Sequence, residues 1–300
     1  KHSDGLASMF NVDLVDDLAR QKVVLFLGAG VSSSAPTRSG DRMKGWPEFL
    51  LDACKNIDPS LQEEVEGLVR AKDYLLACEI LQGAYGDGWS RLIVSEYGQS
   101  AEPSELHKAL IKLDQRIILT TNFDKLIESA WENKFGTSSH YPIVLTGIPD
   151  RAFFALKDYS RKYVVKIHGS TDDADNVVFS RSQYVKSAFA NPLYSDFIDN
   201  LLLNYTLLFV GFSMDDPAII SLMESYSFKY SKSRSHYIFV GNETPERISE
   251  INKRLRKLVS IRYNTADNHK ELPEVISQLA ALMVARRSEI FAEMKVATSL

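Results

Sequence analysis

The sequence has few cysteines, no excess of charge and no long apolar run, and each shortage excludes a class of protein. Cys54 and Cys78 are too few for a disulfide framework, and this usage is typical of the reducing cytoplasm. With 35 Lys and Arg residues against 39 Asp and Glu residues the formal net charge is -4, so no overall positive field would hold nucleic acid or an anionic membrane. The longest apolar run, 23–31, is far too short to span a bilayer. We therefore expect a cytoplasmic protein that binds neither nucleic acid directly nor membranes.

The rest of the composition is typical of a folded chain. Hydrophobic residues make up 45% and charged residues 25% of the sequence, with 15 Gly and 10 Pro, which excludes collagen-like, disordered and coiled-coil chains. A length of 300 residues suffices for one large domain or one domain with an insertion. No secretory signal is recognisable at the N-terminus. Since the first residue is Lys1 and not Met, we leave open that the sequence is a piece of a longer protein.

Short β-branched or aromatic runs alternate with longer segments of helical spacing. The runs lie at 23–27, 116–120, 163–167, 205–210, 237–240 and 259–263. This alternation predicts βαβ units and hence an α/β fold, a Rossmann-like, mainly parallel sheet with helices on both faces. Runs that are apolar almost throughout are typical of strands covered on both sides.

Two segments are longer than a single crossover helix requires. The first is a helical insertion at 46–113, with helical patterns at 46–56, 61–71, 74–85, 90–97 and 104–113. The second, 181–204, is predicted as a helical insertion that roofs a cleft. A C-terminal helix at 270–300 is expected to form an interface or to link to a missing domain. We therefore expect a single domain over 1–300 with these additions.

Polar residues follow four of the predicted strands directly. Because ligands of open parallel sheets bind beyond the carboxyl ends of the strands, these segments predict one shared site. They are Gly28-Ala29-Gly30-Val31-Ser32, Thr121-Asn122-Phe123-Asp124, His168-Gly169-Ser170 and Gly211-Phe212-Ser213-Met214-Asp215-Asp216-Pro217.

Gly28 and Gly30 would let the backbone approach a pyrophosphate closely, with exposed N–H groups and the Ser32 hydroxyl as donors. The alternative is a tight turn that requires a positive φ. The third glycine of the usual dinucleotide fingerprint falls on Ser33. An ordinary dehydrogenase is therefore not supported.

Each of the other motifs has a structural and a chemical interpretation. Asn122 caps the helix that follows it and Asp124 complements the helix dipole, or both serve the site. His168 is a structural residue or a general base, since an imidazole with an ordinary pKa of about 6.5 suits proton transfer at neutral pH. His107 lies in a helical pattern and is predicted to be a surface residue.

The segment after the fourth predicted strand combines both kinds of residue. Asp216 followed by Pro217 is an ordinary helix start. Gly211 and Ser213 lie before that start, where a nucleotide phosphate or ribose would pass. Asn242, after the fifth strand, forms a simple turn or hydrogen-bonds an adenosine ribose.

In this order, and each after a strand, GAGVS, TTNFD, KIHG and FVGFSMDDP resemble the sirtuin-like (SIR2) superfamily over about 23–240. Within it the sequence is most similar to the prokaryotic SIR2-like branch whose members act as NAD-consuming effectors of antiviral defence. Classical deacylases of the superfamily carry a zinc ribbon with two pairs of cysteines, which Cys54 and Cys78 cannot supply. Their cofactor-binding Gly-Ile-Pro-Asp-Phe-Arg element is also replaced, so phosphate or ribose contacts would come from Arg38 or Arg42. The resemblance thus implies a fold with no zinc ribbon and no metal.

This resemblance implies an NAD+ glycohydrolase that splits NAD+ into nicotinamide and ADP-ribose, with some cyclic ADP-ribose. It would act as a regulated, NAD-depleting effector in antiphage or abortive-infection defence. In the catalytic set Asp124 accepts a hydrogen bond from the nicotinamide carboxamide, Asn122 orients water or ribose hydroxyls, and His168 takes the proton. The implied cofactor-binding set is Gly28, Ala29, Gly30, Ser32, Thr121, Gly211, Ser213 and Asn242.

Unregulated NAD+ consumption would poison the host, so gating by a homo-oligomer or by a sensor or activator protein is expected. Three alternatives stay open: an NAD-dependent protein deacylase or ADP-ribosyltransferase, a non-catalytic nucleotide-binding sensor subunit, and a structural α/β domain. The sequence does not decide the trigger, the preference for NAD or NADP, or the balance of hydrolysis and cyclisation.

Overall fold

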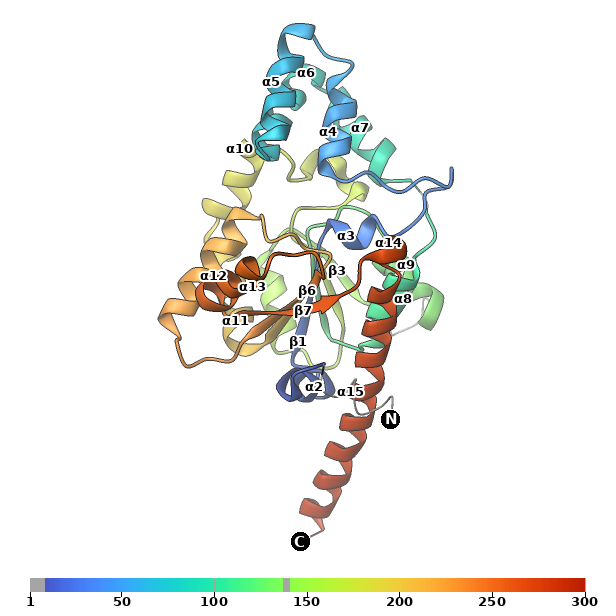
Figure 1. Ribbon diagram of the computed structural model, residues 1–300, viewed down its shortest axis with the longest axis vertical. Helices are drawn as coiled ribbons and strands as arrows, with labels where there is room; N and C mark the ends of the chain where they lie inside the picture. The colour runs from blue at the N-terminus through green and yellow to red at the C-terminus, as the bar shows by residue number, and fades with distance from the viewer. Residues whose placement is uncertain (1–8, 100, 137–140, 300) are drawn as a thin grey trace.

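The computed structural model describes residues 9–99, 101–136 and 141–299 of the chain (Figure 1). Residues 1–8, to which the expectation about a secretory signal applies, lie outside the described residues. Across the described ranges no helix combines the length and the apolar character that crossing a membrane requires.

One sheet of seven strands runs through the described part of the chain, in the order β3-β4-β2-β1-β5-β6-β7, and every strand pair is parallel. The predicted α/β class with a mainly parallel sheet is confirmed. The strands are β1 (Val23–Leu27), β2 (Ile117–Thr120), β3 (Ile143–Thr146), β4 (Tyr163–Lys166), β5 (Thr206–Val210), β6 (His236–Gly241) and β7 (Leu258–Tyr263).

Sequence reasoning missed β3, which lies at the edge of the sheet with β4 as its neighbour. Of its four residues only Leu145 is buried, while Ile143 and Val144 are half-buried and Thr146 is exposed. An edge strand covered on fewer sides needs no continuous apolar run, and such a run was the signal that identified the other strands.

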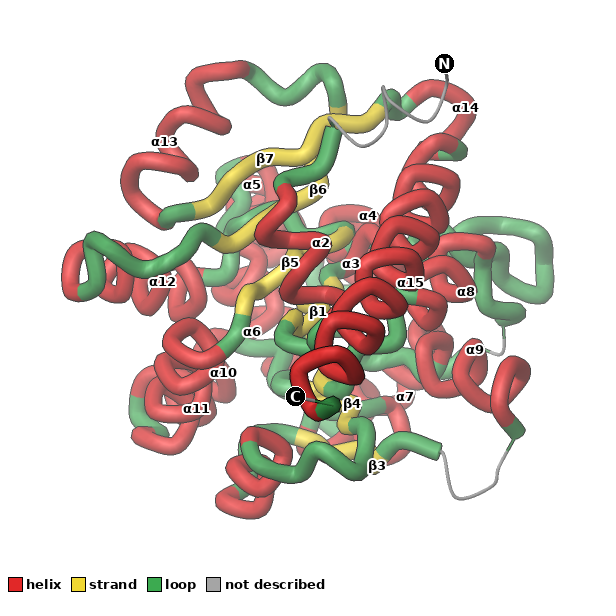
Figure 2. The backbone as a smooth tube through the Cα atoms, turned by 90° about the horizontal axis from the view of Figure 1, so that it is seen from below, coloured by secondary structure: helices red, strands yellow, loops and turns green. Residues whose placement is uncertain are grey.

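Helices cover both faces of the sheet, as Figure 2 shows from below. Because side chains alternate along a strand, Val23, Leu25 and Leu27 of β1 face one layer and Val24 and Phe26 face the other. The first layer contains α2 (Val12–Ala19), α8 (Glu105–Lys112), α9 (Leu126–Phe135) and α15 (Glu271–Thr298). The second contains η1 (Asp150–Leu156), α10 (Arg181–Tyr184), α11 (Pro192–Asn204) and α12 (Pro217–Lys229).

Four helices of the long segment after β1 form a separate group above the short helix α3 (Ala29–Ser32), beyond the carboxyl end of β1 (Figure 1). Their core is aromatic: Trp46 stacks on Phe179 with ring centroids 4.3 Å apart, and Phe123 lies 5.1 Å from Phe179. The fifth predicted helix of this segment, α8, packs on the sheet instead. The four helices of this group are α4 (Trp46–Cys54), α5 (Pro59–Arg70), α6 (Tyr74–Tyr85) and α7 (Gly88–Tyr97).

The segment predicted as one helical stretch over 181–204 is divided in the structure. A π-helical turn, η3 (Val185–Phe189), follows α10, and α11 starts at Pro192. Proline has no N–H and starts a helix well, and Asn191 caps α11 by accepting from the amide of Leu193 at 3.1 Å. Tyr184 is the last residue of α10, directly before the π-helical turn, and its hydroxyl contributes to the candidate active site.

The remaining helical elements follow β4, β6 and β7. They are η2 (Thr171–Asn176), α13 (Glu246–Arg256) and α14 (Ala266–His269). The C-terminal helix expected at 270–300 is α15, whose last turns extend away from the body of the molecule (Figure 1).

Candidate active site

The carboxyl ends of β4, β2, β1 and β5 lie side by side in the sheet. Thr120 of β2 is the register partner of Leu27 on one side and of Lys166 on the other. The segments that leave these strands therefore start at one level, on strands about 4.8 Å apart. After β1 the chain forms β2 on one side and later β5 on the other, which makes this edge the topological switch point where α/β sheets bind ligands.

Gly28, Gly30 and Gly211 bring the β1 turn against the end of β5. The N–H of Gly30 donates to the carbonyl of Gly211 at 2.9 Å, and that of Gly28 donates to the carbonyl of Val210 at 3.0 Å. A Cβ on Gly28 would lie 2.4 Å from the Gly211 oxygen, although Gly28 has a φ of -108°. Lack of space, and not a positive φ, therefore requires glycine at position 28. Both N–H groups are already used within the protein, in contrast to the expectation that they face a pyrophosphate.

Asn122 joins the ends of β1 and β2. Its Nδ2 donates to the carbonyl of Gly28 at 2.8 Å, and its backbone N–H donates to Oγ1 of Thr120 at 3.0 Å. The alternative that Asn122 caps the next helix is wrong, because α9 begins at Leu126 and the carboxylate of Asp124 accepts from the amide of that residue at 2.9 Å. The side chain of Asn122 is half-buried.

Asp124 ties three parts of the site together. Besides the amide of Leu126, its carboxylate accepts a hydrogen bond from the hydroxyl of Ser32, and both residues are buried. His107 of α8 interacts with the Asp124 charge, and burial lowers the pKa of His107 to about 4 even though that charge raises it. The prediction that His107 is a surface residue is wrong: it is buried and its Nδ1 accepts from the amide of Ser104 in a capping box.

His168 pairs with Asp216, with Nε2 and Oδ2 3.1 Å apart. Asp216 is the N-cap of α12, as predicted, since it accepts from the amide of Ile219 at 3.1 Å, and it also accepts from the hydroxyl of Tyr184. Sequence reasoning missed the second role of Asp216 and the part played by Tyr184. The signal for Asp216 was its place after β5 at the same edge of the sheet, whereas no local pattern marks Tyr184.

Lys166, the last residue of β4, is the buried cation of the site, with 0% of its surface exposed. Its Nζ donates to the carbonyls of Phe123 and Asp124, to Oε1 of Glu128 at 3.0 Å and to Oγ of Ser170 at 3.2 Å. Burial raises the pKa of Glu128, although the neighbouring ammonium lowers it. Lys166 thereby holds the segment after β2 against the segment after β4. Sequence reasoning missed this role of Lys166. The signal that could have indicated it is a single lysine within the apolar run 163–167.

The other predicted residues lie around this centre. Thr121 is half-buried and its N–H donates to the carbonyl of Leu27 at 3.3 Å. Ser213 is exposed on the segment between β5 and α12. Asn242 is exposed beyond β6, where its Oδ1 accepts from Oγ1 of Thr265 at 3.2 Å.

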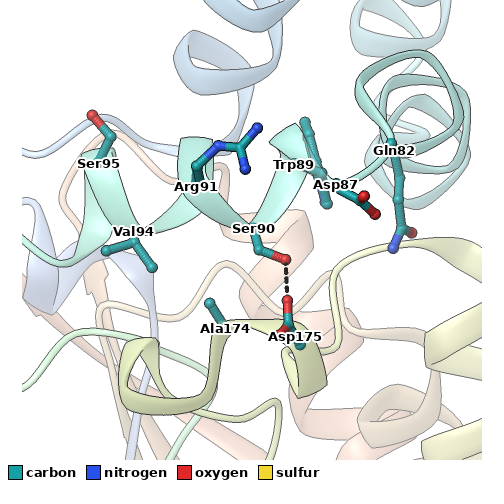
Figure 3. A pocket seen from close by; sticks show the side chains of 10 residues that line it. Gln82, Asp87, Trp89, Ser90, Arg91, Val94, Ser95, Ala174 and Asp175 are labelled. Carbon is teal, nitrogen blue, oxygen red and sulfur yellow. Dashed lines mark hydrogen bonds between the residues drawn. The ribbon is translucent and has the colours of Figure 1, made fainter.

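Two hollows flank the segment that follows His168. One, of about 220 Å³, lies beyond β3 and β4 and is lined by Gly169, Ser170 and Tyr194 among others. The second, of about 950 Å³, lies between α6, α7 and η2, where the hydroxyl of Ser90 donates to Asp175 at 2.6 Å (Figure 3). His168 and Asn122 line neither hollow.

The sequence was compared with known proteins. A family model described as SIR2-like domain matches residues 116–263, from the start of β2 to the end of β7. The NAD(+) hydrolase ThsA of Bacillus cereus (strain MSX-D12) is 25% identical over 290 residues, which cover 91% of this chain and 57% of that protein. The protein of the same name from Enterococcus faecium is 26% identical over 73% of this chain and 43% of its own length.

A further relative is Defense-associated sirtuin 2 of Bacillus subtilis, which is 23% identical over 79% of this chain and 22% of its own length. The chain therefore spans between 22% and 57% of the length of these three relatives. Three of the four strand-end motifs, TTNFD, KIHG and FVGFSMDDP, lie inside the matched range 116–263. Residues 116–263 thus match a SIR2-like domain, in agreement with the resemblance that the motifs of this chain indicated.

Proposed function

We propose that this chain hydrolyses NAD+ to nicotinamide and ADP-ribose and acts as an NAD-depleting effector of antiphage defence. The observation that carries the proposal is the register of β2 and β4: Asn122 and His168 each follow a register pair, Thr120 and Lys166, by two residues. Both side chains thus start from neighbouring strands at the switch point of the sheet. Relatives named NAD(+) hydrolase and defense-associated sirtuin support the choice of substrate and the role.

Hydrolysis of NAD+ does not require an acid catalyst for the leaving group. The nicotinamide nitrogen of NAD+ is already cationic, so the glycosidic bond can break without protonation of the leaving group. The enzyme must hold the nicotinamide, stabilise an oxocarbenium-like carbon and place a water on the vacated face. This chain would supply hydrogen-bonding groups from the ends of β2 and β4 for these tasks.

Asn122 would orient the attacking water or a ribose hydroxyl. Its Nδ2 donates to the carbonyl of Gly28 at 2.8 Å, which fixes the plane of the amide. Oδ1 of Asn122 is then the atom that accepts a hydrogen bond from the water or the ribose hydroxyl. Asp124 already accepts from Ser32 and Leu126. An ionised carboxylate has about four acceptor positions, so Asp124 can also accept from the nicotinamide carboxamide.

His168 would act as the general base. It takes a proton from a ribose hydroxyl or from the attacking water. Gly28, Ala29, Gly30 and Gly211 would form a surface without bulky side chains along which the phosphates and riboses lie. Ser32, Thr121, Ser213 and Asn242 complete the proposed cofactor-binding set.

Regulation by assembly or by a sensor partner belongs to the same proposal. Exposed apolar side chains on the last turns of α15, Phe291 and Met294, support a role of this helix in assembly. Mass measurement in solution, combined with activity over a range of protein concentrations, tests this part. A fully active monomer would contradict it.

The activity is tested by incubating the chain with NAD+ and separating the products by chromatography. Nicotinamide and ADP-ribose in equal amounts are expected, and any cyclic ADP-ribose is resolved in the same run. Absence of nicotinamide at every protein concentration would refute the proposed activity. An acyl-lysine peptide in a parallel reaction shows whether deacylation occurs instead.

A further inference from the structure

Asp216 and His168 form a buried pair between the segments that follow β4 and β5. Nε2 of His168 lies 3.1 Å from Oδ2 of Asp216, and the exposed fractions of the two residues are 5% and 9%. The second oxygen of the carboxylate, Oδ1, accepts from the hydroxyl of Tyr184 and from the amide of Ile219. Two donors from α10 and α12 therefore fix the carboxylate independently of the imidazole.

The environment favours the ionised form of Asp216. The residue caps the 13-residue helix α12, whose dipole stabilises a negative charge at this end. Burial raises the pKa of Asp216, but its hydrogen bonds with His168 and Tyr184 outweigh burial and lower the pKa below the ordinary value. The charge of Asp216 also acts on Tyr194 of α11: burial and this charge raise the pKa of Tyr194.

The contact between the two residues determines where the proton of the imidazole lies. An ionised carboxylate only accepts hydrogen bonds, so Nε2 of His168 must be the donor. In a neutral imidazole Nδ1 is then an acceptor. Nδ1 is buried and has no hydrogen-bond partner among the described residues. Such an acceptor is uncommon and costly, which points to a donor that arrives with the substrate.

We infer that Asp216 is a positioning residue that fixes the tautomer of His168, so that Nδ1 is the atom that removes the proton during NAD+ hydrolysis. The inference rests on the function proposed above, and it adds which nitrogen of His168 takes the proton and which residue fixes that choice. Tyr184 supports it by donating to Asp216 while accepting from the amide of Ala218 at 2.8 Å.

The step balances as follows. The oxygen of the water bonds to the anomeric carbon of the ribose. The bond from that carbon to the ring nitrogen breaks, its electron pair stays on the nitrogen, and neutral nicotinamide leaves. The proton of the water passes to Nδ1 of His168 and later to solvent. While His168 carries both protons, the carboxylate of Asp216 stabilises its charge.

The informative substitution is Asp216→Asn. Asparagine caps helices as well as aspartate does, so the start of α12 is preserved. Ile219 and Tyr184 both donate to the position of Oδ1, so the amide oxygen takes that position and the NH₂ group faces His168. Nε2 must then accept, and the proton moves to Nδ1. We expect kcat to fall about 10²- to 10⁴-fold with little change in KM.

Two variants serve as controls. Asp58→Asn makes the same change at another N-cap, because Asp58 caps α5 and accepts from the amide of Ser60 at 2.8 Å. Asp58 is far from His168 in the sequence, so the turnover of this variant should equal that of the parent. Tyr184→Phe removes one donor from Asp216 but leaves the carboxylate, so its loss should be smaller than that of Asp216→Asn.

A second readout does not depend on turnover. ¹⁵N NMR of the histidine rings reports which nitrogen of His168 carries the proton, and we expect Nε2 in the parent and Nδ1 in Asp216→Asn. Proton on Nδ1 in the parent, or unchanged kcat in a folded Asp216→Asn variant, would overturn the inference. A parent that shows the expected tautomer but releases no nicotinamide would refute the proposed function while leaving the tautomer assignment intact.

Discussion

The side-chain amide of Asn122 donates to the carbonyl of Gly28, with Nδ2 and the carbonyl oxygen 2.8 Å apart, although the residues lie 94 positions apart in the chain. The bond joins the ends of β1 and β2, and the sequence had indicated both residues for the same site. It fixes the orientation of an amide that we propose to contact the reacting sugar or water. The bond therefore connects the packing of the strand ends with the proposed chemistry.

Replacing Asn122 by alanine should lower turnover about 10²- to 10⁴-fold. The loss of one hydrogen bond should lower the free energy of unfolding by only about 1 kcal/mol. Initial rates of nicotinamide release and urea denaturation measure the two effects. Asn200→Ala is the matched control, because Asn200 also donates Nδ2 to a carbonyl at 2.8 Å, in an exposed hydrogen bond within α11. Equal turnover of both variants would exclude Asn122 from the reaction.

Gly211→Ala should destabilise the protein strongly. Gly211 has a φ of +62°, and a Cβ there would lie 2.5 Å from the backbone nitrogen of Val31. Gly40→Ala separates the two causes, because Gly40 has a φ of +86° but no atom within 4 Å of its added Cβ. The control should lose about 1 to 2 kcal/mol from the unfavourable φ alone, and Gly211→Ala clearly more. Similar losses in thermal unfolding would show that the contact between β1 and β5 is not tight.

Lys166→Met should leave the buried Glu128 without its ion-pair partner. Breaking a buried pair from one side costs about 3 to 5 kcal/mol, which chemical denaturation measures. The double variant Lys166→Met/Glu128→Gln should recover much of this loss, because it removes the unpaired charge. It should not recover turnover, because the carbonyls of Phe123 and Asp124 remain without the Lys166 ammonium. Full recovery of turnover would show that Lys166 serves only to neutralise the charge of Glu128.

The stability of the junction between α15 and the sheet should depend on pH through the ionisation of Asp114. Burial raises the pKa of Asp114, but hydrogen bonds with Lys162 and Arg287 lower it below the usual 3.8. A carboxylate with a depressed pKa stabilises the fold above its unfolded pKa, and this contribution is lost as the pH falls through the lower folded value. Since the side chain is 32% exposed, the contribution is about 1 kcal/mol after solvent screening.

The variant Asp114→Asn tests this contribution. Its stability deficit relative to the parent should be present at pH 7 and should shrink as the pH falls below about 4. Thermal unfolding of both proteins across this range measures the difference. A deficit that stays constant with pH would mean that the charge of Asp114 does not stabilise the junction.

The sheet and the edge that holds the site could be predicted because their signals are local. Buried strands such as Val23–Leu27 are continuous apolar runs, and the residues that follow a parallel strand must lie at its carboxyl end. The edge strand Ile143–Thr146 escaped because it needs no such run. His107 was misplaced because a polar residue in a helical pattern resembles a surface residue unless its capping partner, Ser104, is recognised.

The partners of the predicted residues were not predictable in the same way. The contact between His168 and Asp216 depends on how the ends of β4 and β5 lie on either side of β2 and β1. Tyr184 comes from a third place, the junction of α10 with η3. Lys166 stood in a predicted strand, yet its role depends on four acceptors from other parts of the chain. Such long-range pairings leave no periodic pattern in a single sequence.

The most direct test of the central claim compares the parent chain with His168→Ala under identical conditions, by the rate of nicotinamide release from NAD+. We predict release of nicotinamide and ADP-ribose by the parent, and a rate about 10²- to 10⁴-fold lower for a variant that remains folded. Equal rates for the two proteins would contradict the account.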